Sequence, residues 1–172
     1  MNLYRTRTYI AADFDSDKDA VDKLLEWNDS IYHSLSFTNA HELQSSRDSS
    51  KPCSIKQSLK LRMDGSKRFV LIVGNQTDSV TKGACRHCPS YNSWTESCMR
   101  GHVVDHRSFI EYECDKAVEA GIDIVVLYKA AMVNRNKCPE VVRYKGNHLA
   151  MYRFEDGKHY WNYQAIKRAI GG

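Results

Sequence analysis

Stretches of continuous apolar residues alternate along the chain with stretches in which apolar residues recur every three to four positions. The longest continuous runs, residues 69–73 and 124–128, lie in predicted strands at residues 68–73 and 122–128. An uninterrupted apolar run indicates a strand buried on both faces, which is typical of a parallel sheet. Shorter runs predict a first strand at residues 8–12, a weak second strand at 34–37 and a last strand, at a sheet edge, at 148–154.

Helices are predicted between these strands. One apolar stripe, at the spacing of a helix, comprises Ile110, Cys114, Ala117 and Val118. Gly121 supplies a left-handed stop for that helix. An earlier helix begins after Ser16 or Asp17, either of which can cap it, and another follows Pro52 with Ser54 as its cap. A C-terminal helix is expected at residues 160–170.

The alternation of strands and helices predicts an α/β fold with a doubly wound, flavodoxin-like parallel sheet. Ligands of such sheets bind at the carboxyl ends of the strands, where the strand order reverses. In a 2-1-3-4-5 order that crevice lies between the first and third strands. Its predicted rim comprises residues 11–15, 45–50 and 74–77 and the start of the helix at Phe109, so Glu113 falls on the ligand side.

Composition sets the class of protein. A chain of 172 residues with 42% hydrophobic and 27% charged residues indicates one soluble globular domain. The net charge of +4 is scattered and does not favour a nucleic-acid partner. No apolar run reaches the roughly 20 residues of a membrane helix, and the N-terminus lacks the apolar core of a signal peptide. We therefore expect a cytoplasmic protein without a membrane partner.

Cysteines form a second pattern. In a cytoplasmic protein the six cysteines are thiols or metal ligands rather than disulfides. Cys85, Cys88, Cys98 and His102 follow a C-x2-C-x9-C-x3-H spacing, which suits a structural zinc site. His87 and His106 are alternatives for the fourth ligand, and a loop packed by free thiols is the alternative to a metal site. Cys114 lies on the apolar stripe and is expected in the core.

Several segments together resemble a known family. Residues 9–15 form a first strand that ends in a polar turn, residues 37–40 lead into a long polar loop, and residues 69–77 form a buried strand followed by a polar turn. Phe109 and Glu113 match an aromatic-x-x-x-Glu helix start. The chain thus resembles TIR domains, and among them the TIR-like proteins of bacterial Thoeris antiphage defence.

The resemblance implies a single TIR-like domain over residues 1–172, with a cysteine-bearing insertion at 78–106 and a C-terminal extension at 129–172. Catalytic members of the family cleave NAD at the nicotinamide–ribose bond, which implies that Glu113 is the catalytic residue and NAD the substrate. Phe109 stands where the family commonly has Trp. The residues expected to contact NAD are Ala11, Asp13, Phe14, Asp15, Arg47, Asp48, Asn75, Phe109 and Tyr112.

NAD chemistry suits a single glutamate. The nicotinamide departs neutral, so no general acid is required, and one carboxylate can stabilise the oxocarbenium-like transition state. Arg47 and the turn at residues 13–16 are candidates for binding the diphosphate. We further expect an ADP-ribose-derived, diffusible signal for a downstream effector, a phage-derived trigger and self-association.

Two other functions fit the same pattern. One is a non-catalytic TIR-like assembly module, and the other is a nucleoside-processing transferase that also places a glutamate at a ribose. Simpler roles exist for the individual residues. Glu113 can be a solvated helix residue, Phe109 and Tyr112 can be core aromatics, Asp13 and Asp15 can only cap a helix, and Arg47 and Asp48 can be loop polar residues.

Overall fold

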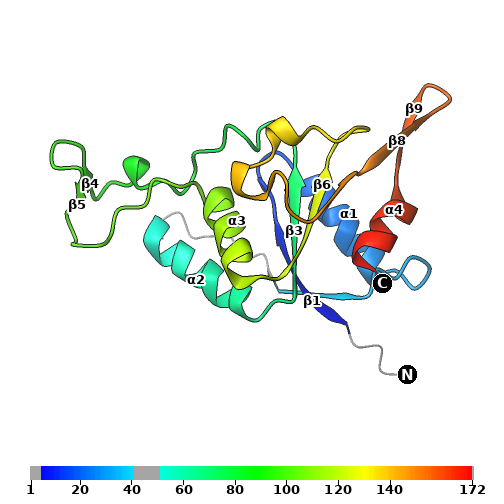
Figure 1. The fold of residues 1–172 in the computed structure, drawn as a ribbon, viewed down its shortest axis with the longest axis horizontal. Coiled ribbons are helices and arrows are strands. Elements are labelled where there is room, and N and C mark those ends of the chain that lie inside the picture. The colour runs from blue at the N-terminus through cyan, green and yellow to red at the C-terminus, as the bar shows by residue number, and fades with distance from the viewer. Residues whose placement is uncertain (1–4, 41–50, 172) are drawn as a thin grey trace.

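The computed structural model describes residues 5–40 and 51–171 and is built on one five-stranded sheet (Figure 1). Its strands are β1 (Thr6–Ala11), β2 (Phe37–Asn39), β3 (Arg68–Val73), β6 (Asp123–Tyr128) and β7 (Asn147–Ala150). They lie in the order β2-β1-β3-β6-β7, and every neighbouring pair is parallel. Counting only these strands, the order is 2-1-3-4-5, so the flavodoxin-like α/β fold is confirmed.

The two continuous apolar runs form the centre of the sheet. β3 and β6 pair over their whole length, from Arg68 opposite Asp123 to Val73 opposite Tyr128. All residues of β3 after Arg68 are buried. The two strands therefore occupy the position that their uninterrupted apolar sequences predict.

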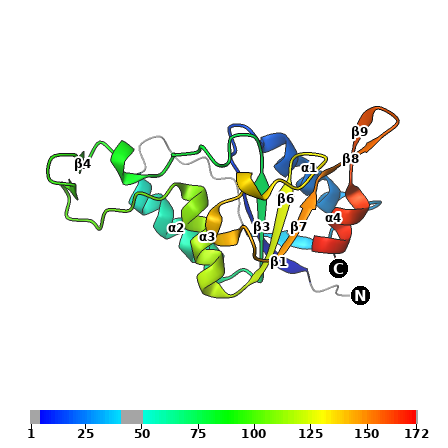
Figure 2. The same cartoon turned by 45° about the horizontal axis from the view of Figure 1, so that its top comes forward.

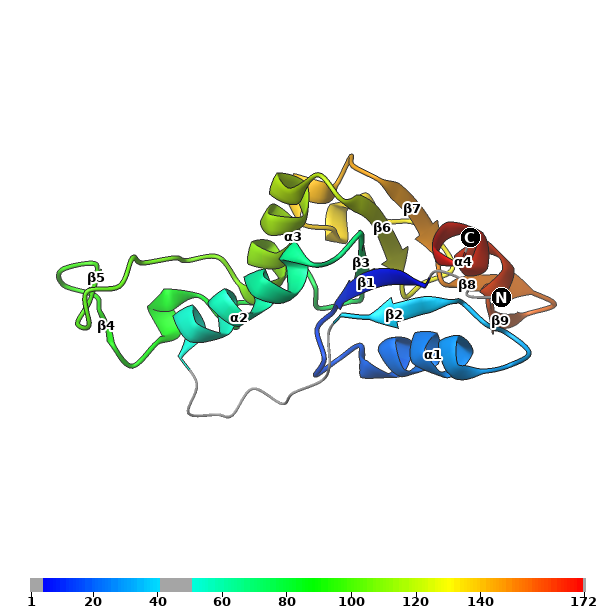
Figure 3. The ribbon, with the colours of Figure 1, turned by 90° about the horizontal axis from the view of Figure 1, so that it is seen from below.

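Helices cover both faces of the sheet (Figures 2 and 3). α2 (Pro52–Asp64) and α3 (Phe109–Ala120) pack on one face, where β3 contributes Phe69, Leu71 and Val73. α1 (Lys18–Asp29) and α4 (Tyr163–Ile170) pack on the other, against Val70 and Ile72. The side chains of β3 alternate between two cores because successive residues of a strand point to opposite faces.

Local sequence signals fix the ends of α3. Ser108 accepts the backbone N–H of Glu111, whose carboxylate accepts the N–H of Ser108 at 2.7 Å, which completes a capping box. Gly121 ends the helix in the left-handed conformation, as predicted, with φ of 63°. The stripe residues Ile110, Cys114 and Ala117 are buried.

The start of α2 differs from expectation, whereas α1 begins after one of the two residues expected to cap it. α2 begins at Pro52 with Lys51 as its N-cap, so Ser54 lies inside the helix; proline suits the first turn, where its missing N–H has no helical partner. Asp17 is the N-cap residue of α1, but its side chain makes no cap hydrogen bond.

Two strand boundaries are also corrected. β2 starts at Phe37 rather than at residue 34, because Ser34 and Ser36 have positive φ values of 48° and 59° that a strand does not accommodate. The predicted last strand is two elements. β7 ends at Ala150, and β8 (Tyr152–Glu155) turns back into β9 (Lys158–Trp161) as an antiparallel hairpin. Residues 160 and 161 therefore belong to β9, and α4 begins at Tyr163.

The remaining segments lie between the main elements. Residues 78–106, predicted as an insertion, connect β3 to α3 and hold η1 (Cys85–His87), β4 (Tyr91–Asn92) and β5 (Ser97–Cys98). This part of the chain projects beyond α2, away from the sheet (Figure 1). Two 3-10 turns, η2 (Arg135–Lys137) and η3 (Glu140–Val142), lead from β6 to β7. Across residues 5–40 and 51–171, no helix combines the length and apolar character that crossing a membrane requires.

Candidate active site at the start of α3

Glu113 is buried between α3 and the sheet. Its side chain points to β1, where the hydroxyl of Tyr9 donates a hydrogen bond to Oε1 at 2.5 Å. Only 5% of Glu113 is exposed, and Tyr9 is fully buried. The alternative of a solvated helix residue is therefore excluded, and β1 and α3 jointly hold one carboxylate inside the domain.

Burial changes the acidity of this pair. Desolvation raises the pKa of Glu113 from 4.5 to about 7, although the hydrogen bond from Tyr9 acts in the opposite direction. Burial and the neighbouring carboxylate raise the pKa of Tyr9 well above its usual 10, so the phenol stays protonated and remains a donor. Near neutral pH, Glu113 can thus exist in both protonation states, and a nearby cation would favour the carboxylate.

Phe109 is covered by the chain that precedes it in sequence. The backbone N–H of Phe109 donates to the carbonyl of Lys82 at 2.8 Å. Gly83, with φ of 99°, lies so close to the ring that a Cβ atom there would be 2.5 Å from Cδ1 of Phe109. Lys82 also reaches Asp15, with Nζ 3.4 Å from Oδ2. Lys82 and Gly83 therefore bring together two predicted rim residues, Asp15 and Phe109.

Asp17, expected only as a helix cap, and Lys129, which the sequence did not single out, lie beside the predicted rim residues Gly74 and Thr77 at the carboxyl ends of the strands. Asp17 is 2% exposed, and burial raises its pKa. Its Oδ1 is 3.5 Å from Nζ of Lys129, while Oδ2 has no hydrogen-bond partner among the described residues. A Cβ at Gly74 would lie 2.1 Å from Oδ1 of Asp17, and Thr77 accepts the N–H of Gly74. A sequence signal for this contact exists, because Gly74 directly follows the buried strand β3 and the turn at residues 13–17 is rich in aspartate.

The other rim residues have local roles. Ala11 is fully buried, and Phe14 packs against the α1 side of the core. Asp13 organises its own turn, because its carbonyl accepts the N–H of Asp17 at 2.7 Å and its Oδ1 accepts that of Asp15. Asn75 accepts a hydrogen bond from Lys137 at 2.8 Å. Arg47 and Asp48 lie outside the described residues.

Tyr112 lies in the contact between α2 and α3. Its ring is surrounded by three cations, with Lys56 and Lys116 each 5.6 Å and Arg107 5.1 Å from the centroid. These contacts are typical of cation–π packing. Tyr112 therefore packs among cations, and it also lies in the same core cluster as Tyr9, whose pKa it helps to raise.

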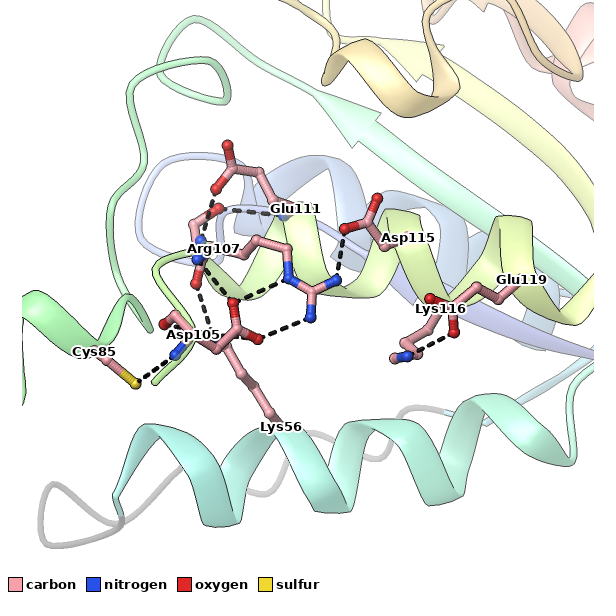
Figure 4. Close-up of polar contacts among 9 residues, drawn as sticks. Lys56, Cys85, Asp105, Arg107, Glu111, Asp115, Lys116 and Glu119 are labelled. Carbon is pink, nitrogen blue, oxygen red and sulfur yellow. Dashed lines mark hydrogen bonds and ion pairs between the residues drawn. The ribbon is translucent and has the colours of Figure 1, made fainter. Parts of the chain in front are cut away.

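A charged network anchors the chain where it enters α3 (Figure 4). Arg107 donates to both carboxylate oxygens of Asp105, at 3.0 and 2.9 Å, and to Asp115 at 2.6 Å. Lys56 of α2 is 3.3 Å from Asp105 and donates to the carbonyl of Arg107 at 2.7 Å. Although partial burial opposes the shift, these partners lower the pKa of Asp105 to about 2. This network thus holds the first turn of α3 in addition to the hydrogen bond between Phe109 and Lys82.

The cysteines separate into two groups. Cys114 and Cys138 are buried in the core, the former as predicted. Cys85, Cys88, Cys98 and His102 line one pocket, which Cys53 of α2 also lines. His106 instead packs edge-on against Tyr91. As placed, no three or more His, Cys, Asp or Glu side chains in the described parts of the chain are arranged to hold a metal ion.

Part of the sequence matches a known protein family. Residues 9–82, which run from the first strand through α1, α2 and β3, match the model of a family described as Thoeris protein ThsB, TIR-like domain. Over these residues the chain is similar to ThsB-like, TIR-like proteins. The match supports a TIR-type protein of antiphage defence. It ends before α3, so the role of Glu113 depends on the geometry of the site. No curated protein gives a significant match to the sequence.

Proposed function

We propose that this TIR-like protein cleaves NAD at the bond between nicotinamide and ribose, with Glu113 as the catalytic carboxylate. The observation that carries the proposal is the buried Tyr9–Glu113 pair on β1 and α3. A buried carboxylate is costly for the fold unless it has a partner. A cationic substrate would supply that partner, which gives a reason for placing an acid there.

The reaction requires little of the protein beyond a well-placed negative charge. The bond between ribose C1′ and the nicotinamide nitrogen breaks, and its electron pair goes to the nitrogen, which leaves as neutral nicotinamide. Positive charge then develops on the ribose, as in glycoside cleavage. Glu113 stabilises this charge as a carboxylate, and Tyr9 holds the carboxylate in position by its hydrogen bond.

The second half of the reaction determines the product. Water that attacks C1′ and loses its proton gives ADP-ribose, whereas attack by a nitrogen of the adenine gives a cyclic product. A conjugated ADP-ribose would require another nucleophile in the site. Each of these products can serve as a diffusible signal, which fits a role upstream of an effector in antiphage defence.

Access to Glu113 is the step that requires a conformational change. Phe109 is covered by Lys82 and Gly83, and Glu113 is 5% exposed, which supports assigning this conformation to a resting state. We propose that residues 81–84 move away from Phe109 when the protein is triggered. Activity then depends on the trigger, and an inactive resting protein is compatible with an active site at Glu113.

The test measures nicotinamide release from NAD by triggered protein, with mass spectrometry of the remaining product. Glu113→Gln keeps the size of the side chain but removes its charge, and we expect a loss of at least a few hundred-fold in rate. Glu111→Gln is the matched control, because glutamine can replace glutamate in the capping box with Ser108. Equal activity of both variants would remove Glu113 from this role.

A non-catalytic assembly module is the second candidate, and the burial of Glu113 is the observation that favours it. In that case, the pair with Tyr9 would serve only the fold, and triggered protein would release no nicotinamide. A transferase acting on other nucleosides remains the third candidate. It is distinguished by product analysis, because it would consume nucleosides that lack the nicotinamide cation.

A further inference from the structure

The four cysteines outside the core all face one place. Cys53, Cys85, Cys88 and Cys98 line a single pocket, together with Lys51, Ser90 and His102. They come from three elements, since Cys53 lies in the first turn of α2, Cys85 and Cys88 bracket η1, and Cys98 lies in β5. Cysteines from chain segments far apart in the sequence thus line the same pocket.

The backbone holds these elements together. β4 and β5 pair with Tyr91 opposite Cys98, and the N–H of Met99 donates to the carbonyl of Ser90 at 2.8 Å. Lys51, at the N-terminus of α2, donates to the hydroxyl of Ser90 at 2.6 Å. The start of α2 is therefore in contact with the projecting segment, close to the C-x2-C pair.

Two of the sulfur atoms already accept backbone hydrogen bonds. The N–H of Asp105 donates to Sγ of Cys85 at 3.2 Å. The backbone N–H groups of Arg100 and His102 hydrogen bond to the thiol of Cys98. Donors of this kind stabilise thiolates, and metal-bound ligands in proteins are supported by such outer hydrogen bonds.

The projecting segment has no apolar core of its own. Between residues 85 and 103, Ser90 is the only buried residue, and both strands are two residues long. The apolar side chains are instead exposed, with Trp94 95%, Val103 90% and Met99 68% exposed. A unit this small needs a disulfide, a metal or another cross-link to hold one structure.

We propose that Cys53, Cys85, Cys88 and Cys98 bind one zinc ion as four thiolates and thereby join the projecting segment to α2. Four sulfur ligands that include a C-x2-C pair make a typical structural zinc site. Because the described placement does not form a metal site, binding includes rotation of the cysteine side chains towards the pocket. The ion and four thiolates together carry two negative charges, which Lys51 and Arg100, both close to Cys98, partly offset.

Cys53 distinguishes this site from one confined to residues 85–102. His102 also lines the pocket, but its side chain belongs to the exposed end of the projecting segment. Cys53 belongs to a helix anchored in the core by Leu59 and Met63. A zinc ligand on α2 cross-links the projecting segment to the domain, whereas a zinc ligand from His102 would cross-link residues within that segment only.

Elemental analysis of untagged protein purified without chelator tests the proposal, together with the visible spectrum of the cobalt-substituted protein. We expect about one zinc per chain and a cobalt spectrum with strong thiolate bands. Cys53→Ser should lower the zinc content several-fold and weaken the thiolate bands. His102→Ala and the neighbouring Ser54→Ala should retain both.

Chelator-treated wild-type protein provides a test that requires no substitution. Removing the metal should increase proteolytic cleavage within residues 85–103, and returning zinc should reverse the effect. Wild-type protein without zinc or a tetrahedral cobalt spectrum would overturn the proposal. It would also be overturned if His102→Ala lost the metal while Cys53→Ser, folded by circular dichroism, kept it.

Discussion

Replacing Glu113 by glutamine should increase stability at alkaline pH while it abolishes activity. Burial raises the pKa of Glu113 from 4.5 to about 7 in the folded protein. A folded-state pKa above the unfolded value means that the folded protein binds the proton more tightly. The wild-type protein therefore loses stability from this group as the pH rises from about 4.5 to about 7, and the loss is complete at higher pH.

The magnitude follows from the size of the pKa change. At about 1.4 kcal/mol per pH unit, keeping Glu113 ionised in the fold costs about 3 kcal/mol above pH 8. Glutamine cannot ionise, so it avoids this cost. Its amide leaves a buried donor to satisfy, but that penalty of about 1–3 kcal/mol is the same at every pH. The pH dependence of the difference, rather than its absolute value, therefore isolates the charge.

The assay is urea unfolding of wild-type protein and Glu113→Gln at pH 5, 7 and 9. The free energy of unfolding of the variant, minus that of the wild type, should rise by about 2–3 kcal/mol between the lowest and highest pH. Glu111→Gln should show no such rise, because Glu111 is exposed. A constant difference for Glu113→Gln across this range would refute the description of Glu113 as a buried carboxyl with a raised pKa.

Three further predictions concern its surroundings. Tyr9→Phe should move the pKa of Glu113 further upward, because the hydrogen bond from Tyr9 lowers it, and carboxyl titration followed by NMR measures the change. Gly83→Ala should lower the free energy of unfolding by about 2 kcal/mol or more, because φ is 99° and the new Cβ meets Phe109. Gly101→Ala is the steric control, because Gly101 has a positive φ but open space around it. Arg107→Ala should lower the free energy of urea unfolding by about 1–2 kcal/mol at pH 7. This difference should disappear as the pH falls towards 2 and Asp105 is protonated. Arg100 is exposed, so Arg100→Ala should change the free energy little.

The sheet could be predicted from the sequence because its strongest signals are local. The apolar runs of β3 and β6 indicate two buried neighbours, and Ser108, Glu111 and Gly121 mark the ends of α3. The β8–β9 hairpin was missed although Asp156 and Gly157, which both have positive φ, form a tight-turn signal. The apolar run from residue 148 to 154 outweighed that turn in the prediction.

The candidate site could be predicted only in part, because its chemistry depends on contacts between distant residues. Periodicity places Glu113 beside the apolar stripe, but its pKa is raised by burial in the fold and lowered by the hydrogen bond from Tyr9, more than a hundred residues earlier. The contacts of Asp17 with Gly74 and Lys129 also form only in the folded sheet. Cys53 lies far in sequence from the other pocket cysteines, so its place in that pocket is likewise seen only in the fold.

The energetics of the chain around α3 indicate which part of it can open. The ion pair between Lys82 and Asp15 is more than 60% exposed on both sides, so it contributes only about 0–1 kcal/mol and cannot hold residues 81–84 closed. Arg107, by contrast, joins two carboxylates, and Lys56 ties the same network to α2. The proposed opening over Phe109 must therefore break the hydrogen bond from the N–H of Phe109 to the carbonyl of Lys82 and expose the buried Ala84. The network of Arg107 and Lys56 would hold the chain at the start of α3 during that movement.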